Sequence, residues 1–322
     1  MQRKILVTGG RGFIGSHIVD ACITCGDAVV SVDDMSFGKE ENANPQAPNH
    51  LADISDAGAL ERVFQTFAPE IIFHCAALAR IQPSFQNPQR YFDVNAVGTR
   101  NVLALAKQYG VKRVVYSASS SAYGNTDTNV LTEDLLLPAQ ALHPYGSTKR
   151  MGEMLMRDMG LGTGGIETVC LRYFNVYGPR QTTTMDGPYA TVIGIFLDLL
   201  RQGKPLTIVP DGHQRRDFTW VHDVVRANLL ASESALVGNG EIINIGTGEN
   251  HSIWDVARFI LGADAHVSPE QLLDSKRCVM APERRGEVRV TLADNSRARE
   301  LLGWAPQKSF HDSIRELVTA LQ

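Results

Sequence analysis

Short apolar runs alternate along the first half of the chain with longer segments in which apolar residues recur at helical spacing. Strands are predicted for the β-branched runs at residues 5–8, 28–33, 71–75, 113–118 and 168–173. Helices are predicted for the segments at residues 14–25, 57–67, 91–109 and 147–159. This alternation favours an α/β fold, with a parallel sheet covered by helices on both faces.

The regular alternation ends near residue 178, and the chain from there to residue 216 is rich in Pro and Gly, with one predicted helix at 192–202. A further helix is predicted at 217–231, followed by a strand at 242–245 that could rejoin the parallel sheet. The remainder, including 251–261 and 296–302, predicts a small α+β lobe. We therefore expect two interleaved domains, formed by residues 1–175 with 216–248 and by residues 176–215 with 249–322.

Composition narrows the class of protein without identifying it. The 322 residues are 43% hydrophobic and 20% charged, which is typical of a globular protein with a sizeable core. The net charge of −4 shows no excess of basic residues that would attract a nucleic acid, so we expect no nucleic-acid partner. No apolar run approaches the ~20 residues that span a bilayer, and the first one passes directly into a Gly-rich turn. We therefore expect a cytoplasmic protein with no membrane partner.

The cysteines favour neither a disulfide framework nor a metal site. There are five of them, an odd number in a long chain, so we expect reduced thiols. Cys22 and Cys25 form a CxxC pair within a predicted helix, but no second pair and no histidine at ligand spacing accompany it. We therefore expect no bound metal.

A Gly-rich turn after the first strand is the first sign of a ligand. It can be read as GxxGxxG through Gly9, Gly12 and Gly15, or as GxGxxG starting at Gly10. Such glycines let the backbone approach a pyrophosphate, and the following helix offers its unpaired N–H groups to the anion. The turn lies between a predicted strand and a predicted helix, which is the context that a dinucleotide site requires.

Acidic residues after the next strands extend this site. Asp33 ends the second strand, where a carboxylate accepts hydrogen bonds from the ribose hydroxyls and repels a 2′-phosphate, so we expect NAD as the cofactor. Asp53 could reach the adenine, although a turn or cap role fits its sequence context equally well. The other positions in these motifs that we expect to contact the cofactor are Phe13, Ile14, Ile54 and Ala76.

A candidate proton-transfer site lies far downstream. Tyr145 and Lys149 are four residues apart at the start of a predicted helix, so their side chains share one face. A free phenol is a poor base at neutral pH, and a nearby ammonium would stabilise its anionic form. Ser119 ends the strand at 113–118, from where its hydroxyl could bind the same substrate oxygen. These residues predict proton and hydride transfer on an alcohol or ketone.

Several motifs in order give the chain a family resemblance. The chain resembles the extended short-chain dehydrogenases/reductases of the nucleotide-sugar epimerase and dehydratase group, most of all the UDP-hexose and UDP-N-acetylhexosamine 4-epimerases. The motifs that carry the resemblance over nearly the whole length are TGGRGFIG, VDDMSFG, HCAALA, SSSAYG, PYGSTK, LRYFNVYGPRQ, DGHQRRDFTWVHDV, NIGTG and PERRGEV.

The resemblance implies an architecture and an assembly. It implies a seven-stranded Rossmann-type domain that binds NAD and a smaller domain, with a UDP-sugar substrate between them. The family commonly pairs the helices at 91–109 and 147–159 across a two-fold axis, so the resemblance also implies a homodimer built on a four-helix bundle.

The resemblance also implies roles for individual residues. Ser119, Tyr145 and Lys149 match the catalytic positions, and Tyr145 and Lys149 also contact the cofactor. Residues at positions that contact the nucleotide sugar are Arg80, Ser84, Ser119, Ser120, Ser121, Asn175, Arg216, Arg284, Glu287 and Thr291. Two of these, Arg216 and Arg284, would hold the diphosphate by charge-assisted hydrogen bonds.

Three positions bear on which reaction the chain performs. Ser120 and Ser121 stand where the 4,6-dehydratases have an Asp-Glu pair, which argues against dehydration. Thr291 stands where the family gates the C2 substituent, and it is small enough to admit an N-acetyl group. Arg80 departs from the small residues of the N-acetylhexosamine epimerases, and it could point away, bind the carboxylate of a uronic acid or fill the N-acetyl pocket.

The leading interpretation is NAD-dependent epimerisation at C4 of a UDP-sugar (UDP-GlcNAc/UDP-GalNAc or UDP-Glc/UDP-Gal) through a 4-keto intermediate. The alternatives are a UDP-glucuronate 4-epimerase, or a dehydratase, decarboxylase or reductase that uses the same keto intermediate. A catalytically silent protein that binds NAD on the same fold is a further alternative.

Overall fold

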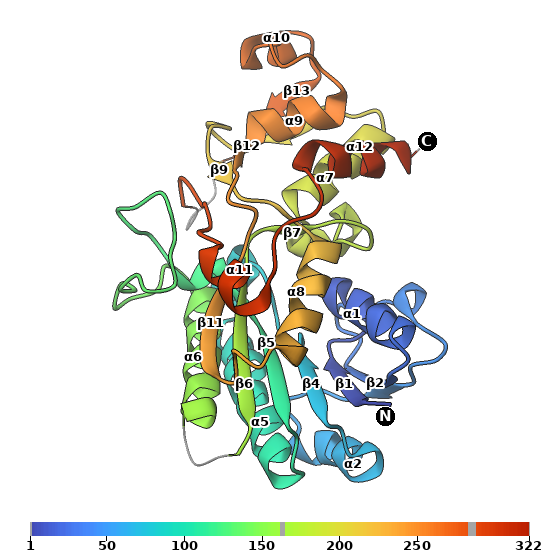
Figure 1. Cartoon of the computed structure of the whole chain (residues 1–322). Coiled ribbons are helices and arrows are strands. Elements are labelled where there is room, and N and C mark those ends of the chain that lie inside the picture. Colours follow the sequence, from blue (N-terminus) through green and yellow to red (C-terminus); the bar gives the residue numbers. More distant parts are fainter. Residues whose placement is uncertain (1, 162–164, 283–287, 322) are drawn as a thin grey trace.

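A parallel sheet dominates the larger part of the molecule (Figure 1). The computed structural model describes residues 2–161, 165–282 and 288–321. Within these residues the sheet has seven strands in the order β11-β6-β5-β4-β1-β2-β3, and every neighbouring pair is parallel. The strands are β1 (Lys4–Thr8), β2 (Ala28–Asp33), β3 (Asn49–Leu51), β4 (Ile71–His74), β5 (Arg113–Ser119), β6 (Glu167–Tyr173) and β11 (Asn239–Ile245).

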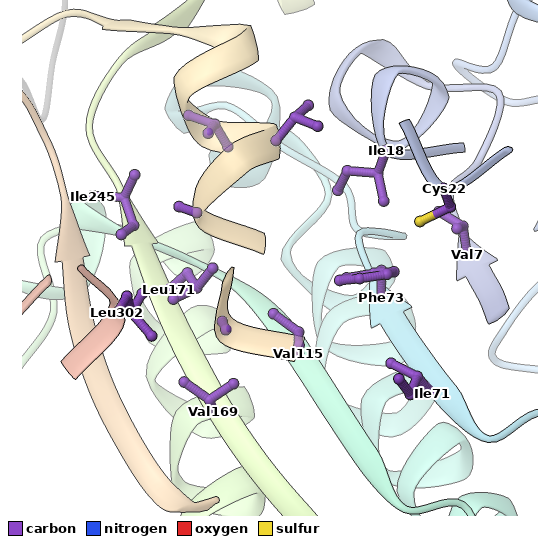
Figure 2. Close-up of a cluster of buried hydrophobic side chains, with 14 of the residues drawn as sticks. Val7, Ile18, Cys22, Ile71, Phe73, Val115, Val169, Leu171, Ile245 and Leu302 are labelled. Atoms are coloured by element: carbon purple, nitrogen blue, oxygen red, sulfur yellow. The ribbon is translucent and has the colours of Figure 1, made fainter. Parts of the chain in front are cut away.

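Both faces of this sheet are buried, which explains why its strands are apolar without alternation. Ile5 and Val7 point into one core, whereas Leu6 between them points into another. Figure 2 shows part of the first core, where Val7 and Phe73 of the sheet face Ile18 and Cys22 of α1. The predicted α/β fold of Rossmann type is confirmed.

Helices cover the sheet on each side. On the face of the first core lie α1 (Phe13–Thr24), α8 (Val221–Glu233) and α11 (Ser296–Leu302). On the opposite face lie α2 (Ala57–Phe67), α5 (Thr99–Gln108) and α6 (Pro144–Leu161). All five cysteines are free. No helix in the described part of the chain is long and apolar enough to cross a membrane.

Two predicted helices differ from the observed ones. The helix expected at 91–109 is divided into α4 (Pro88–Phe92), a π-helical stretch, η2 (Asp93–Gly98), and α5. In this stretch the Asn95 amide bonds both backbone groups of Leu78, at 2.8 and 2.9 Å, and it also donates to Thr148. The π-helical stretch thus connects the loop after β4, which contains Leu78, to α6, which contains Thr148. The periodicity of apolar residues does not predict such a tertiary contact.

The helix expected at 217–231 begins four residues later, at Val221. Asp217 is fully buried, and its carboxylate accepts hydrogen bonds from the backbone N–H groups of Thr247, Gly248 and Ala293. Residues Thr219–Trp220 form β10, which pairs with β7 (Val176–Tyr177). The buried carboxylate and this pairing hold the segment extended.

A smaller lobe lies beyond the carboxyl ends of the strands, at the top of Figure 1. Its own core contains Phe196, Trp254 and Ile314. The elements of the lobe are η4 (Thr184–Tyr189), α7 (Val192–Arg201), β8 (Leu206–Ile208), β9 (Arg215–Arg216), β12 (His251–Ser252), α9 (Ile253–Leu261), α10 (Pro269–Asp274), β13 (Cys278–Met280) and α12 (Phe310–Thr319). Helix α11 packs instead on the sheet side, where Leu302 and Trp304 enter the first core.

Candidate active site

A cavity of about 430 Å³ opens at the carboxyl ends of the central strands, where the chain order reverses between β1 and β4. Gly9 after β1, Asp33 at the end of β2, Ala76 after β4 and Ser119 at the end of β5 all line it. This crevice is where open α/β sheets bind ligands. A second cavity of about 240 Å³ adjoins it, and the two share wall residues, namely Arg80, Ile81, Ser120, Ser121, Asn175, Val176 and Ala190.

The Gly-rich turn forms one end of the larger cavity. Gly9 has a φ of +69°, and a Cβ on Gly15 would lie 2.1 Å from the carbonyl oxygen of Gly9. No side chain caps the N-terminus of α1, which leaves its first N–H groups available to an anion. Gly12, Phe13 and Ile14 line the same wall. The cradle fits the pyrophosphate of a dinucleotide, because any larger side chain would fill it.

Asp33 lies at the adenosine end of this cavity. Its carboxylate accepts hydrogen bonds from the backbone N–H groups of Arg11 and Met35, at 3.0 and 2.9 Å. Burial raises the pKa of Asp33, and these two hydrogen bonds act in the opposite direction. The carboxylate therefore has a fixed orientation, and its remaining lone pairs can accept from a ribose diol.

Asp53 and Ile54 line the cavity beside Asp33, as does Ala76 on the opposite wall. Asp53 accepts hydrogen bonds from the N–H and hydroxyl of Ser55 and from Arg90, whose Nη2 lies 2.6 Å away. These donors outweigh burial and lower the pKa of Asp53. Asp53 thus has the turn role that the sequence offered as one alternative, and it also lines the cavity. Its contact with the adenine stays a prediction.

Tyr145 and Ser119 lie together in the wall of the larger cavity. Helix α6 begins at Pro144, so Tyr145 lies in its first turn rather than before it. Burial raises the pKa of the Tyr145 phenol, while the Ser119 hydroxyl and the charge of Arg80 act in the opposite direction. Ser119 in turn accepts a hydrogen bond from the backbone N–H of Ser121, which fixes the position of its oxygen.

Lys149 lies one turn further along α6 and is almost fully buried. Its Nζ donates to the carbonyl oxygen of Ser117 at 2.7 Å and lies 5.0 Å from the centre of the Tyr116 ring. Burial lowers the pKa of Lys149 to about 8. Among the described groups, the charge of Arg80 lowers the pKa of the Tyr145 phenol. The action of Lys149 on this phenol stays a prediction.

Arg80 is held in the wall that separates the two cavities. Its Nε donates to the carbonyl oxygen of Tyr189 at 2.8 Å, and Nη2 donates to the Thr182 hydroxyl at 3.2 Å. The Tyr91 hydroxyl bonds the backbone carbonyls of Ala79 and Arg80. The guanidinium thus faces the ligand space, and it makes no ion pair with a described carboxylate.

Most of the remaining sugar-site candidates line the second cavity, namely Ser120, Ser121, Asn175, Arg216 and Thr291. The Asn175 amide donates to the backbone carbonyl of Asp217 at 2.8 Å and to the Thr291 hydroxyl at 3.4 Å. Arg216 donates to the carbonyl oxygen of Arg215 at 3.0 Å. The structure thus gathers residues that are more than a hundred positions apart in the chain.

Among the described candidates, Ser84 and Lys149 line neither cavity. Ser84 is fully buried in α3 (Ile81–Gln86), where its hydroxyl donates to the carbonyl oxygen of Ile81 at 2.7 Å, and it lines neither cavity. Arg284 and Glu287 lie outside the described residues.

Many wall residues were not found from the sequence, and four of them are Phe37, Thr182, Tyr189 and His143. Phe37, Thr182 and Tyr189 line the larger cavity, and the Phe37 and Tyr189 rings pack at 4.0 Å between centroids. His143 lines the second cavity, two residues before Tyr145. The first three come from irregular segments that carry no periodicity, so only their tertiary contacts reveal them. His143 could have been noticed as the residue that precedes a Pro at the start of a helix.

A Rossmann-type sheet with a glycine cradle, an acidic ribose site and a tyrosine at the strand ends defines a dinucleotide-dependent enzyme. The profile of the NAD-dependent epimerase/dehydratase family matches residues 5–246. The chain belongs to this family, and its cofactor is NAD, as the sequence predicted.

The chain is similar along almost its whole length to proteins that act on nucleotide sugars. It is 35% identical to the UDP-glucose 4-epimerase of Mycolicibacterium smegmatis, covering 98% of this chain and 97% of that one. The solved UDP-glucose 4-epimerase of Thermotoga maritima with UDP-glucose is 37% identical, with a TM-score of 0.88 and coverage of 98% and 97%. A UDP-N-acetylglucosamine 4-epimerase from Methanobrevibacter ruminantium, in complex with UDP-N-acetylmuramic acid, is 33% identical, with a TM-score of 0.85 and coverage of 99% and 98%.

The relatives also include other reactions. A UDP-glucuronate 4-epimerase from Thermodesulfobacterium geofontis is 32% identical, and a UDP-N-acetyl-α-D-glucosaminuronate decarboxylase from Bacillus cytotoxicus is 30% identical. The protein is thus an NAD-dependent nucleotide-sugar epimerase/dehydratase by family, and the substrate has to be argued from its own residues.

Proposed function

We propose that this protein epimerises a UDP-sugar at C4 through a 4-keto intermediate. The observation that carries the proposal is the group of Ser119 and Tyr145 in the wall of the NAD cavity, beside a second cavity large enough for a sugar. The similarity to 4-epimerases supports the reaction type. The 4-keto intermediate has lost a hydride and a proton relative to the substrate, and both are returned to it, so the overall reaction involves no net oxidation.

The chain's own residues supply the proton chemistry. The Tyr145 phenolate accepts the proton of the C4 hydroxyl and later returns it to the oxygen of the opposite epimer. Ser119 donates to that oxygen and holds it beside the phenol. Lys149, which is buried one turn further along α6, would hold the nicotinamide ribose. NAD, when bound, would supply the acceptor and donor of the C4 hydride, so that the hydrogen can be removed from one face of C4 and restored to the other.

The residues beside Ser119 argue against dehydration. Ser120 and Ser121 line both cavities, and neither serine can abstract a proton from C5 without a stronger base. We propose that these hydroxyls hydrogen-bond the sugar. Thr291, a small residue of the second cavity, leaves space for an N-acetyl group at C2. Asn175 and Arg216 contact the diphosphate from the wall of the same cavity.

A second candidate substrate is UDP-glucuronate, because Arg80 presents a guanidinium to both cavities. A cation with no described carboxylate partner suits a C5 carboxylate, which it could bind with two parallel hydrogen bonds. The relative from Thermodesulfobacterium geofontis, a UDP-glucuronate 4-epimerase, supports this second candidate.

Product analysis tests the function. The purified protein is incubated separately with UDP-glucose, UDP-N-acetylglucosamine and UDP-glucuronate, and the products are followed by NMR and mass spectrometry. We expect interconversion of C4 epimers of one of these substrates without change of mass. Loss of water or of carbon dioxide would contradict the epimerase proposal, and absence of any turnover would support a silent NAD-binding protein.

Removing the Tyr145 hydroxyl tests the assigned base. Tyr145→Phe should lower kcat by about a hundredfold or more, the usual contribution of a positioned acid–base group. The NAD content of the purified variant should stay unchanged, because the ring remains. Tyr109→Phe, directly after α5, is a matched control that removes a hydroxyl bonded to Glu61, and it should keep full activity. A Tyr145→Phe variant with the wild-type rate would show that another group is the base.

We also propose that the protein is a homodimer through a four-helix bundle. Large apolar side chains stand exposed on the face formed by α3, α4 and α6, namely Phe85, Phe92, Met151 and Met154. An apolar surface of this kind suits burial against a second copy.

A further inference from the structure

His143 is a buried histidine in the wall of the second cavity that the proposed mechanism does not use. Only 5% of its surface is exposed, and it lies directly before Pro144, the first residue of α6. A Cβ on Gly146 would lie 2.8 Å from the Ser121 carbonyl oxygen and 3.2 Å from the His143 ring. The imidazole therefore lies beside the serines that line the sugar space.

One hydrogen bond fixes the tautomer of this imidazole. The backbone N–H of Gly146 donates to His143 Nδ1 at 3.0 Å, as it would to an N-cap side chain. Because Nδ1 accepts, a neutral ring carries its proton on Nε2. Burial, with the nearby charge of Arg150, lowers the pKa of His143 to about 4, so the ring is neutral near pH 7.

Two aromatic contacts fix the orientation of the ring. The His143 ring lies parallel to that of Tyr145, with centroids 6.1 Å apart and planes 9° apart. Phe85 meets it edge-on at 6.4 Å. Among the described residues, no side chain or backbone group bonds the Nε2 atom. Because Nε2 is not among the fully buried polar atoms that lack a partner, its proton can bond a molecule in the adjoining cavity, which His143 lines.

We propose that His143 is a substrate-positioning residue whose Nε2–H donates a hydrogen bond to an acceptor oxygen on the sugar ring of the nucleotide sugar. The inference rests on the proposed function, since it requires a sugar in the second cavity. Arg80, Ser120 and Ser121 border the cavity at the same end as His143. The acceptor is therefore on the sugar, near the carbon that reacts at Tyr145, and not on the nucleotide.

The variant His143→Asn separates this role from helix capping. Asparagine caps helices well, so the variant keeps an acceptor for the Gly146 N–H while it loses the Nε2 donor. We expect binding of UDP-glucose to the NAD-loaded protein to weaken three- to tenfold, the fold-change that corresponds to one neutral hydrogen bond of about 1 kcal/mol. Binding of UDP, which has no sugar, should be unchanged. His266→Asn, at an exposed histidine that lines neither cavity, is the matched control.

Nitrogen-15 NMR of the imidazole gives a readout that a capping role alone would not move. We expect the His143 ring, identified by its loss in His143→Asn, to be the neutral Nε2–H tautomer at pH 7. Its Nε2–H proton should shift on saturation with UDP-glucose and not with UDP. A protonated Nδ1, or no shift at saturation, would overturn the inference.

The binding data distinguish failure of the inference from failure of the proposed function. Equal affinity of wild type and His143→Asn for UDP-glucose overturns the inference and leaves the epimerase proposal standing. Where UDP-glucose does not bind, UDP-N-acetylglucosamine and UDP-glucuronate are used in the same way. Failure of all three to bind more tightly than UDP removes both proposals together.

Discussion

At the scale of single residues, burial and a nearby charge have opposite effects on the pKa of the Tyr145 phenol. Burial in the cavity wall raises the pKa of Tyr145, which disfavours the anion that the reaction needs. Ser119 and Arg80 offset that cost, the first by a hydrogen bond and the second by its charge. Lys149 is directed to the Ser117 carbonyl instead, so the motif lysine alone does not account for an active base.

Arg80→Gln tests this balance through the pH dependence of the rate. Removing the cation takes away a group that lowers the pKa of Tyr145, so the pKa of the base rises. The acidic limb of the kcat/KM profile should therefore move to higher pH, and the rate at neutral pH should fall. Arg80→Lys, which keeps the charge, should restore part of the shift.

The same variants distinguish the two candidate roles of Arg80. If Arg80 binds a substrate carboxylate, Arg80→Gln should raise KM for UDP-glucuronate and leave neutral UDP-sugars unaffected. Arg315→Gln, at an exposed arginine on α12, is the control and should leave the profile unchanged. An unmoved acidic limb in Arg80→Gln would contradict the electrostatic role.

At the scale of elements, the N-termini of α1 and α6 differ in what they present to the cavity. Helix α1 has no side-chain cap, and its N–H groups point from the glycine turn toward the space for the pyrophosphate. Helix α6 is capped by His143 and carries Tyr145 and Lys149 on one face. The backbone of α1 is therefore available to an anion, whereas α6 positions the side chains that we propose to react.

Gly15→Ala tests the glycine turn. The new Cβ would lie 2.1 Å from the Gly9 carbonyl oxygen, so α1 must move away from the turn that cradles the pyrophosphate. We expect at least a tenfold loss of NAD affinity, measured as bound NAD and by calorimetric titration.

The control for this change is Gly58→Ala in α2. Its Cβ would meet nothing closer than 3.6 Å, so the variant should keep NAD and gain about 0.4–1 kcal/mol of stability. Full NAD occupancy in a folded Gly15→Ala protein would contradict the role assigned to the turn.

At the scale of the whole molecule, the cavities form where the sheet meets the lobe. Arg80 follows a strand of the sheet, yet its guanidinium is held by Thr182 and Tyr189 from the lobe side. On the outside, α6 carries both the reactive residues and the exposed Met151 and Met154. The proposed dimer would thus bury the back of the helix whose front forms the active site.

Met154→Glu tests the dimer. Met154 is 64% exposed on α6, and a charge there would be buried against the second copy without a partner. We expect wild type to have the mass of a dimer by light scattering and the variant to be mostly monomer. Leu236→Glu is the control at a site 63% exposed between α8 and β11, and it should remain a dimer. A monomeric wild type would remove the proposal.

The sequence by itself predicted the parallel sheet and the glycine turn, and it pointed to Ser119, Tyr145 and Lys149 as the proposed catalytic residues. Strands that are buried on both faces appear in the sequence as continuous apolar runs. A phosphate-binding turn needs glycines at fixed spacing, so both features can be recognised from short stretches of sequence. The short strand β3 was missed, since three residues at a sheet edge give too little pattern.

Only the tertiary structure decided which charged side chain lies near the Tyr145 phenol, which histidine lines the second cavity and where the helices bend. Arg80 and Tyr145 are separated in sequence by one strand, β5, and the direction of the Arg80 side chain depends on Thr182 and Tyr189. The π-helical stretch at Asn95 and the extended segment at Asp217 likewise depend on distant backbone partners. Such contacts are set by packing between segments, and packing leaves no periodic signal in the chain.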